Sequence, residues 1–283
     1  MIRSKMREAV AEAVFALWPF SFAHETLMGF LDPPFRRGRT STRIRGYPLR
    51  IAFDGGSYIG RFLDYRGIYE EGVIRKIASV LGPGMGFVDV GANIGLHCLV
   101  AAHKVGVSGR VLALEPQRLV YERLKANIAL NDLSQVIALN LAAGAADSES
   151  PLYQLSEGND GLATLALSAD ERLSTQETVR VEQLDAVIKR VFGDALPDVI
   201  KIDVEGGELE VLRGATSTFL QSRPNHVFVE CIEHHLNRFN ATSGMLIQWL
   251  VDAGFKVSGL KAGRWVGVQP EDGVNMDLMA MRA

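Results

Sequence analysis

The stretch FVDVGANIG, residues 87–95, decides the fold of this chain. Its first four residues are apolar except for Asp89, and two glycines, Gly91 and Gly95, follow with Asn93 between them. Glycine adopts positive φ angles without a steric penalty and leaves room for another backbone or a ligand to approach. The stretch therefore predicts a buried strand, a tight turn at Gly91 and a following helix, with a ligand bound above the turn.

Beyond this turn, short apolar runs alternate with segments of helical spacing. Strands this apolar are covered on both faces, which indicates a parallel sheet with crossover helices. The pattern predicts an α/β fold with an open, doubly wound sheet. The expected strands are 87–90, 111–115, 136–140, 199–205, 226–233, 255–260 and 274–281, the last antiparallel at or near the sheet edge. The expected helices are 70–81, 96–104, 119–130, 209–220 and 245–253, and an insertion of short strands is expected over 146–184.

Composition narrows the class of protein. The chain has 283 residues, of which 47% are hydrophobic, so it can bury a sizeable core. Its net charge of −3 gives no general argument for a polyanionic partner. Cys98 and Cys231 lie far apart in apolar runs. We expect two reduced core thiols in a cytoplasmic protein, and neither a disulfide nor a metal pair.

Residues 1–67 form a compositionally separate N-terminal extension, and residues 68–283 form the main domain. The extension begins with an apolar-periodic segment that Pro19 ends, which predicts an amphipathic helix in preference to a cleaved leader peptide. This helix either covers the core or makes a peripheral contact with a membrane surface. No run reaches the ~20 apolar residues of a spanning helix. A hairpin is expected near the end of the extension.

Two features of the extension raise the alternative of a nucleic-acid methyltransferase. The first is a run of arginines without an acid among them, which is typical of phosphate-binding surfaces but more often of a solvated loop and strand. These are Arg36, Arg37, Arg39, Arg43, Arg45 and Arg50. The second is LDPPF, residues 31–35, which resembles the turn that grips a flipped base. No buried strand leads into it, so a proline turn is preferred and nucleic acid is not the expected partner.

The charge around the glycine turn discriminates between cofactors. Dinucleotide-binding turns have the spacing G-x-G-x-x-G, and this turn reads G-A-N-I-G. Asp89 just before the turn would repel a pyrophosphate and favour a cation. S-adenosylmethionine (SAM) carries a sulfonium and an ammonium group and no phosphate. Glu115, at the end of the next strand, suits the two ribose hydroxyls. SAM is therefore preferred over NAD, and a NAD-type oxidoreductase stays the alternative.

Several stretches resemble the FkbM-type group of class I SAM-dependent methyltransferases. They are IYEEGVIRKI (68–77), GFVDVGANIGLHCLVAA (86–102), LALEP (112–116), RLKANIALNDL (123–133), VEQLDAV (181–187), VIKIDVEGGELEVLRGA (199–215) and VFVECIEHH (227–235). The most specific is IKIDVEG followed by Glu208. The resemblance implies a Rossmann-like, mostly parallel seven-stranded sheet and methyl transfer to a hydroxyl of a small molecule or glycan.

By the same resemblance, the cofactor-binding residues are Asp89, Gly91, Ala92, Asn93, Gly95, Glu115, Asn140 and Ala142. Asn140 is equally well explained as a turn residue. Asn127 and Asn131 also match the family pattern, and we interpret both as helix-end caps. His97, in the helix after the glycine turn, is expected to pack rather than to act in chemistry.

Methyl transfer to a hydroxyl needs alignment and a general base. The catalytic candidates lie at the ends of the fourth and fifth strands and are Asp203, Glu205, Glu230 and His234. Asp203 or His234 is the expected base, with Glu205 and Glu230 positioning the acceptor or the base. Four alternatives remain. A divalent metal on Asp203, Glu230 and His234 is not favoured. In a second alternative, Asp203 only caps the following helix or contacts the cofactor amine. In a third, Glu230 and His234 form a buried hydrogen-bonded pair. A non-catalytic module that keeps the cofactor fold is a further possibility.

Overall fold

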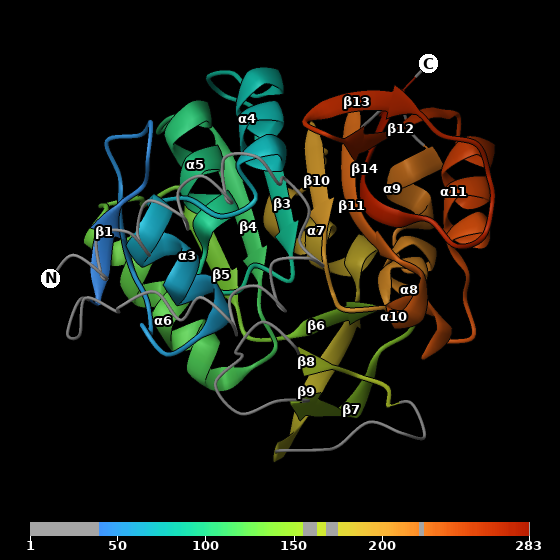
Figure 1. Cartoon of the computed structure of the whole chain (residues 1–283), viewed down its shortest axis with the longest axis horizontal. Coiled ribbons are helices and arrows are strands. Elements are labelled where there is room, and N and C mark those ends of the chain that lie inside the picture. The colour runs from blue at the N-terminus through green and yellow to red at the C-terminus, as the bar shows by residue number, and fades with distance from the viewer. Residues whose placement is uncertain (1–39, 155–162, 168–174, 221–223, 283) are drawn as a thin grey trace, which may run out of the picture.

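The computed structural model describes residues 40–154, 163–167, 175–220 and 224–282 (Figure 1). The predicted amphipathic helix, the LDPPF segment and the first three arginines of the run lie outside the described residues. Within the described ranges, no helix has the length and apolar character needed to cross a membrane.

The main sheet confirms the predicted α/β class. Its strands are β3 (Gly86–Val90), β4 (Arg110–Leu114), β5 (Val136–Leu139), β10 (Val199–Ile202), β11 (His226–Ile232), β12 (Phe255–Lys261), β13 (Arg264–Gly267) and β14 (Asn275–Arg282). They lie in the order β13-β12-β14-β11-β10-β3-β4-β5. Pairing is parallel from β11 to β5 and antiparallel on both sides of β14.

Two details of this sheet differ from expectation. The last strand, β14, is antiparallel as expected but lies between β11 and β12, so it is not an edge strand. The edge is formed by β13, an eighth strand that pairs with β12. The residues of β13 are mostly exposed, so they lack the apolar alternation that reveals a strand in sequence.

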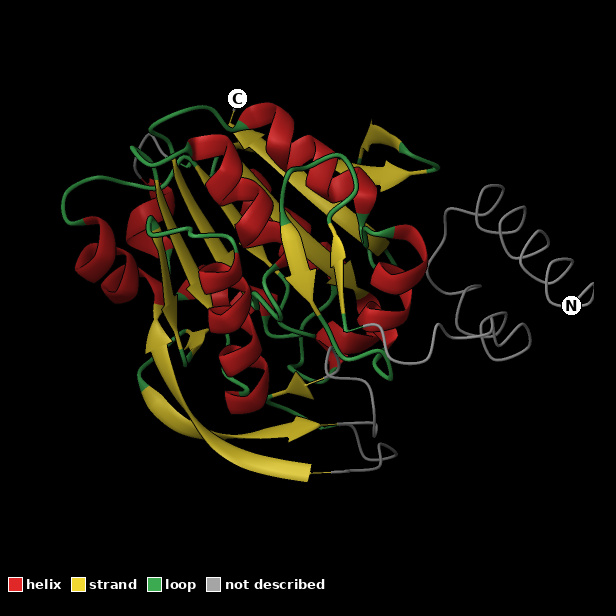
Figure 2. Ribbon diagram, turned by 90° about the vertical axis from the view of Figure 1, so that its left-hand side faces the viewer, coloured by secondary structure: helices red, strands yellow, loops and turns green. Residues whose placement is uncertain are grey.

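Helices cover both faces of the main sheet (Figure 2). One face packs on α4 (Glu71–Val80), α5 (Leu96–Val105) and α6 (Arg118–Leu130), and the other on α7 (Leu184–Phe192), α8 (Glu208–Arg213) and α11 (Ser243–Asp252). Alternate residues of a strand enter opposite cores: Phe87 lies in the first core and Val88 in the second. Cys98 and Cys231 are buried free thiols, one in each core, as predicted.

The predicted helix 209–220 is interrupted. The chain forms α8 and then α9 (Thr216–Leu220), separated at Gly214 and Ala215. A Cβ at Gly214 would lie 1.9 Å from the carbonyl oxygen of Gly144, so the helix ends where it meets the neighbouring strand. Asp185 then accepts hydrogen bonds from the N–H groups of Ser217 and Thr218 and caps α9.

The insertion forms a second sheet, as its short apolar runs predicted. Its strands are β6 (Ala142–Gly144), β7 (Ser148–Gln154), β8 (Ala163–Thr164) and β9 (Thr175–Gln183), in the order β6-β9-β7-β8. Figure 1 shows this sheet beneath the lower end of the main sheet, where the parallel strands finish. It therefore borders any ligand that binds at those strand ends.

The described part of the extension packs on the main domain. The expected hairpin is β1 (Ser41–Arg43) with β2 (Arg50–Ala52), and an unpredicted helix α3 (Tyr58–Arg66) follows it. Asn127 accepts from Ala52 N at 2.7 Å and donates to Ala52 O at 3.0 Å, and Asn131 makes the same pair of bonds to Arg50. The two asparagines thus bind the free edge of β2, which corrects their interpretation as simple helix caps. Asn131 also donates to the helical carbonyl of Asn127, so part of that interpretation holds.

Candidate active site

A cavity of about 750 Å³ opens at the carboxyl ends of β3, β4, β10 and β11. Parallel sheets bind their ligands at this edge, and the volume suits a small-molecule site. The second sheet closes one side of the cavity with Leu152, Ala163 and Leu165. Of the expected residues, nine line it: Gly91, Ala92, Asn93, Glu115, Ala142, Asp203, Glu205, Glu230 and His234. Asp89, Gly95 and Asn140 do not.

The glycine turn is fixed between two neighbouring strands. Gly91 has a φ of +80°, and a Cβ there would lie 1.8 Å from the carbonyl oxygen of Asp203. The N–H groups of Gly91 and Ala92 both donate to Leu114 O, at 3.0 and 2.9 Å. Asn93 also has a positive φ, of 50°. No side chain larger than hydrogen fits at Gly91, which explains this glycine on packing grounds.

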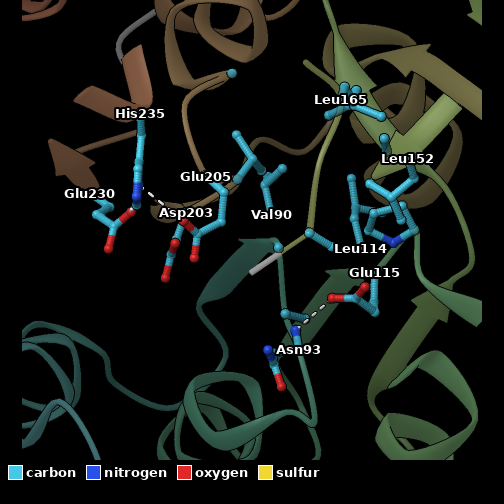
Figure 3. A pocket seen from close by; sticks show the side chains of 18 of the residues that line it. Val90, Asn93, Leu114, Glu115, Leu152, Leu165, Asp203, Glu205, Glu230 and His235 are labelled. Carbon is cyan, nitrogen blue, oxygen red and sulfur yellow. Dashed lines mark hydrogen bonds and ion pairs between the residues drawn. The ribbon is translucent and has the colours of Figure 1, made fainter. Parts of the chain in front are cut away.

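Glu115 connects the turn to the end of β4 (Figure 3). One carboxylate oxygen accepts from Asn93 N at 2.9 Å and the other from Gln117 N at 2.8 Å. Burial raises the pKa of Glu115 to about 7, although these backbone hydrogen bonds oppose the shift. Each oxygen keeps a further lone pair, so the carboxylate can still accept from a hydroxyl in the cavity.

Three predicted cofactor residues, Asp89, Gly95 and Asn140, are not among the residues that line the cavity. The Asn140 amide donates to the carbonyl oxygens of Glu115 and Pro116, at 2.9 and 2.7 Å, and so braces the turn after β4. Gly95 begins α5 with a φ of +99°, and a Cβ there would lie 2.7 Å from Leu124. Asp89 is fully buried below the turn. These placements favour positioning over direct contact for Asn140 and Gly95.

The strand registers bring ionisable side chains together on one face of the sheet. Lys201 lies opposite Asp89 of β3, and Glu230 lies opposite Asp277 of β14. Because side chains alternate along a strand, all four project toward the face that α5 covers. Asp203, just past β10, is level with Glu230. The sequence contains these residues in separate apolar runs, so only the strand order reveals the group.

Lys201 is the centre of this group, and the sequence prediction missed it. Its ammonium is 2.9 Å from Asp203 Oδ2 and 3.8 Å from Asp89 Oδ1, and the residue is 4% exposed. Burial opposes its charge, but the carboxylates of Asp203, Asp89 and Glu70 raise the pKa of Lys201 above the usual lysine value. A charged residue inside the run VIKI was the available signal.

A second cluster joins Glu205, Glu230 and His235 on the same side of the cavity (Figure 3). His235 Nδ1 lies 3.0 Å from Glu205 Oε2 and 3.6 Å from Glu230 Oε2. Burial and the neighbouring charges of Asp203 and Glu205 raise the pKa of Glu230 well above its usual range. The histidine that meets Glu230 is therefore His235, and the predicted buried pair of Glu230 with His234 is wrong.

Both histidines lie on helix α10 (Glu233–Asn237), but only His235 is buried. His234 is exposed at the cavity rim, and its ring contacts the ring of His235 at 4.1 Å between centroids. Glu233 instead accepts from Ser243 N and Gly273 N, at 2.8 and 3.1 Å, so its role is structural. The sequence does not indicate which of the two adjacent histidines is buried, because that depends on where the helix begins.

Glu208 holds the turn that presents Glu205. Its Oε1 accepts from Val204 N and Gly206 N, at 3.1 and 3.0 Å. Burial raises the pKa of Glu208 to about 7, against these same hydrogen bonds. This contact gives a structural reason for the motif IKIDVEG followed by Glu208.

The wall near α4 contributes Glu70 and His97, which are 3.2 Å apart. Burial favours the neutral carboxyl, but the hydrogen bond and charge of His97 hold the pKa of Glu70 below its usual value. Both residues line the cavity. His97 therefore does more than pack, although no described contact gives it a chemical role.

The arginine run is partly described. Arg45 forms an ion pair with Glu71, and Arg50 lies on β2, where Asn131 binds its backbone. Arg43 is exposed on β1. These placements agree with a solvated loop and strand for the three described arginines.

Comparison with known proteins gives consistent matches. A family model described as the methyltransferase FkbM domain matches residues 89–257. The chain is 31% identical over 195 residues to the hexuronic acid methyltransferase AglP of Haloferax volcanii, covering 66% of this chain and 72% of that protein. It is 35% identical over 153 residues to methyltransferase sdnD of Sordaria araneosa, covering 45% of this chain and 59% of that protein. A solved SAM-dependent O-methyltransferase from Thermotoga maritima is 14% identical with a TM-score of 0.40, covering 76% of this chain and 66% of that chain.

Proposed function

Because this chain belongs to the FkbM family and is a SAM-dependent methyltransferase, we propose that it methylates a hydroxyl oxygen of a small molecule or glycan. The relative AglP is named for a hexuronic acid, which makes sugar acids the first acceptors to test.

One observation supports this proposal: the residues predicted to bind the donor and those predicted to act on the acceptor line different sides of one cavity. Asn93 of the glycine turn and Glu115 lie on one side, and Asp203, Glu205, Glu230 and His235 lie on the other (Figure 3). His234 also lines the cavity. The first side fits the donor, because Glu115 offers lone pairs to ribose hydroxyls and Leu114, Ala142 and Leu152 offer apolar surface. The described contacts around the turn include no N–H cradle for a diphosphate.

The bound donor supplies an electrophilic methyl carbon on a positively charged sulfur. The acceptor oxygen would attack this carbon, and the carbon–sulfur bond would break with its electrons left on sulfur. The hydroxyl proton must leave, and we assign it to His234. His234 is exposed at the rim, so it can pass the proton to water. Asp203 is held by its ion pair with Lys201, so we assign it a positioning role.

Donor binding and methyl transfer test this function directly. Calorimetry should show that the protein binds SAM and does not bind NAD. With methyl-labelled SAM and glucuronic acid or its glycosides, label should appear on a hydroxyl oxygen, as read by NMR of the product. Binding of NAD without binding of SAM would overturn the donor assignment.

The base is tested separately with matched histidine variants. His234→Gln should lower kcat by about a hundredfold or more and leave the Kd for SAM unchanged, because general-base catalysis contributes about 10² to 10⁴. His226→Gln, at the opposite end of β11, is the control and should retain the wild-type kcat. An unchanged kcat in His234→Gln would remove this residue from the mechanism.

A further inference from the structure

Glu205, Glu230 and His235 bring three metal-type ligand atoms to one point of the cavity. The closest atoms are His235 Nδ1 and Glu205 Oε2 at 3.0 Å, with Glu230 Oε2 3.6 Å from the same nitrogen. One ligand atom from each residue lies within 4.8 Å of the other two. Ligands about 2.1 Å from a shared cation are separated by about 3.0 to 3.5 Å in octahedral or tetrahedral coordination. The two separations from His235 Nδ1, 3.0 and 3.6 Å, are close to that range.

The backbone holds Glu205 in place before any ligand arrives. Glu205 has a φ of 57°, and its carbonyl oxygen accepts from Thr164 Oγ1 at 3.0 Å and from Arg238 Nη1 at 3.2 Å. The next residue, Gly206, touches α10: a Cβ there would lie 2.3 Å from His235 O. The turn after β10 is therefore packed directly against the residue that completes the cluster.

Hydrogen bonding leaves atoms of this cluster unsatisfied. Glu205 Oε2 and His235 Nδ1 are both buried and, among the described residues, neither has a hydrogen-bond partner of acceptable geometry. His235 is only 9% exposed. A buried imidazole nitrogen without a hydrogen bond is costly, so a ligand at this point would stabilise the group.

The local charge favours a cation. Two carboxylates, Glu205 and Glu230, share the point with one imidazole, and Asp203 and Asp277 add to the negative potential at Glu230. Lys201 is engaged with Asp203 and Asp89. Carboxylates gathered in this way repel one another unless a proton or a cation is bound between them.

We propose that Glu205, Glu230 and His235 bind a divalent transition-metal cation such as Mn²⁺. One imidazole nitrogen and two carboxylate oxygens form a mixed donor set that such ions accept. All three residues line the cavity, so the remaining coordination positions face it. In the proposed function, an acceptor hydroxyl would occupy one of those positions. Only this last step rests on the proposed function. The site differs from the alternative that the sequence raised and did not favour, in which the ligands were Asp203, Glu230 and His234.

The test measures metal binding without an enzyme assay. The full chain is treated with a chelator, exchanged into metal-free buffer and titrated with MnCl₂ by calorimetry. Electron paramagnetic resonance follows the loss of the free-ion signal. We expect one saturable Mn²⁺ site per chain. His235→Gln, Glu205→Gln and Glu230→Gln should each weaken binding about tenfold or more.

A matched acid provides the control. Glu210 lines the same cavity but pairs with Arg213, so Glu210→Gln should bind Mn²⁺ like the wild type. Circular dichroism and SAM binding report whether each variant is folded. Absence of a saturable site, or wild-type affinity in a folded His235→Gln, overturns the metal site. Because SAM binding is measured on the same samples, failure of the metal site is distinguished from failure of the proposed function.

Discussion

At the scale of single residues, Lys201 determines the charge balance of the site. It is a buried ammonium with a carboxylate on either side, Asp203 at 2.9 Å and Asp89 at 3.8 Å. Removing one partner from a buried ion pair leaves an uncompensated charge, which costs more than the pair itself contributes. Asp89 has no side-chain exposure through which water could replace Lys201.

We therefore expect Lys201→Met to lower the free energy of unfolding by about 3 to 5 kcal/mol. The loss should be smaller in the double variant Lys201→Met/Asp89→Asn, since the orphaned acid is then gone. Urea unfolding of the four proteins of this cycle measures both effects. Lys256→Met, on the exposed side of β12, is the control and should change stability little. Equal stability of Lys201→Met and wild type would refute the ion-pair account.

The sequence identified those candidate residues whose place is determined by their immediate neighbours in the chain. Gly91 and Glu115 follow from a tight turn and a strand end, both readable over a few residues. Lys201 and His235 were missed because each is joined by a carboxylate from a different strand, Asp89 of β3 and Glu205 after β10. Their importance comes from register and helix phase, and neither is encoded by spacing along the chain.

At the scale of elements, two asparagines pair with the edge of β2 as a neighbouring strand would. Asn127 lies in α6, and Asn131 is the residue that caps its C-terminal end. Asn127 and Asn131 are one helical turn apart, and each satisfies both the N–H and the C=O of a β2 residue. An exposed strand edge is a place where unwanted pairing occurs, and these amides cover it. Asn127 also donates to Ile94 O at 2.8 Å, so the hairpin is linked to the glycine turn.

Asn127→Ala should cost about 3 kcal/mol of stability, because one buried and two partly buried backbone groups lose their partner. Asn131→Ala, at a more exposed position, should cost less. Hydrogen exchange provides the specific measurement: the Ala52 amide should exchange faster in Asn127→Ala, and the Arg50 amide in Asn131→Ala. Unchanged protection of the Ala52 amide would contradict the proposed docking.

The alternation of strands and helices was predictable because buried parallel strands are nearly continuous apolar runs. The failures have two causes. The break between α8 and α9 and the place of β14 depend on contacts with elements that are distant in sequence. The edge strand β13 is mostly exposed and lacks the apolar pattern of a strand. The hairpin was expected, and its attachment to α6 was not. The boundary at residue 67 between extension and main domain remains a prediction.

At the scale of the whole molecule, buried carboxyl groups make the free energy of unfolding depend on pH. Burial raises the pKa of Glu115 and Glu208 to about 7 and, with the charges of Glu70 and Asp203, that of Asp277 to about 8. A carboxyl with a raised pKa keeps its proton in the folded state after the unfolded chain has released it. Stability is therefore highest below the unfolded pKa and falls as the pH rises through the folded value.

We expect the free energy of unfolding of the ligand-free protein to fall between pH 5 and pH 8. Glu115 alone contributes a loss of about 3 kcal/mol at most over its window from 4.5 to about 7. His226, whose pKa is lowered by burial, opposes the trend with a smaller shift. Urea unfolding at several pH values should give a flatter profile for Glu115→Gln. The control Glu122→Gln, exposed on α6, should keep the wild-type slope, and an identical slope in Glu115→Gln would contradict the prediction.

The two carboxylates beside Lys201, those of Asp89 and Asp203, also bear on how the catalytic cycle ends. The fresh donor enters with a positive sulfur, and transfer leaves that sulfur neutral while these acids remain. The spent donor thus lacks an attraction that acts on the fresh donor. Inhibition by the spent donor should therefore become more pronounced than in the wild type when the negative charge of Asp203 is removed.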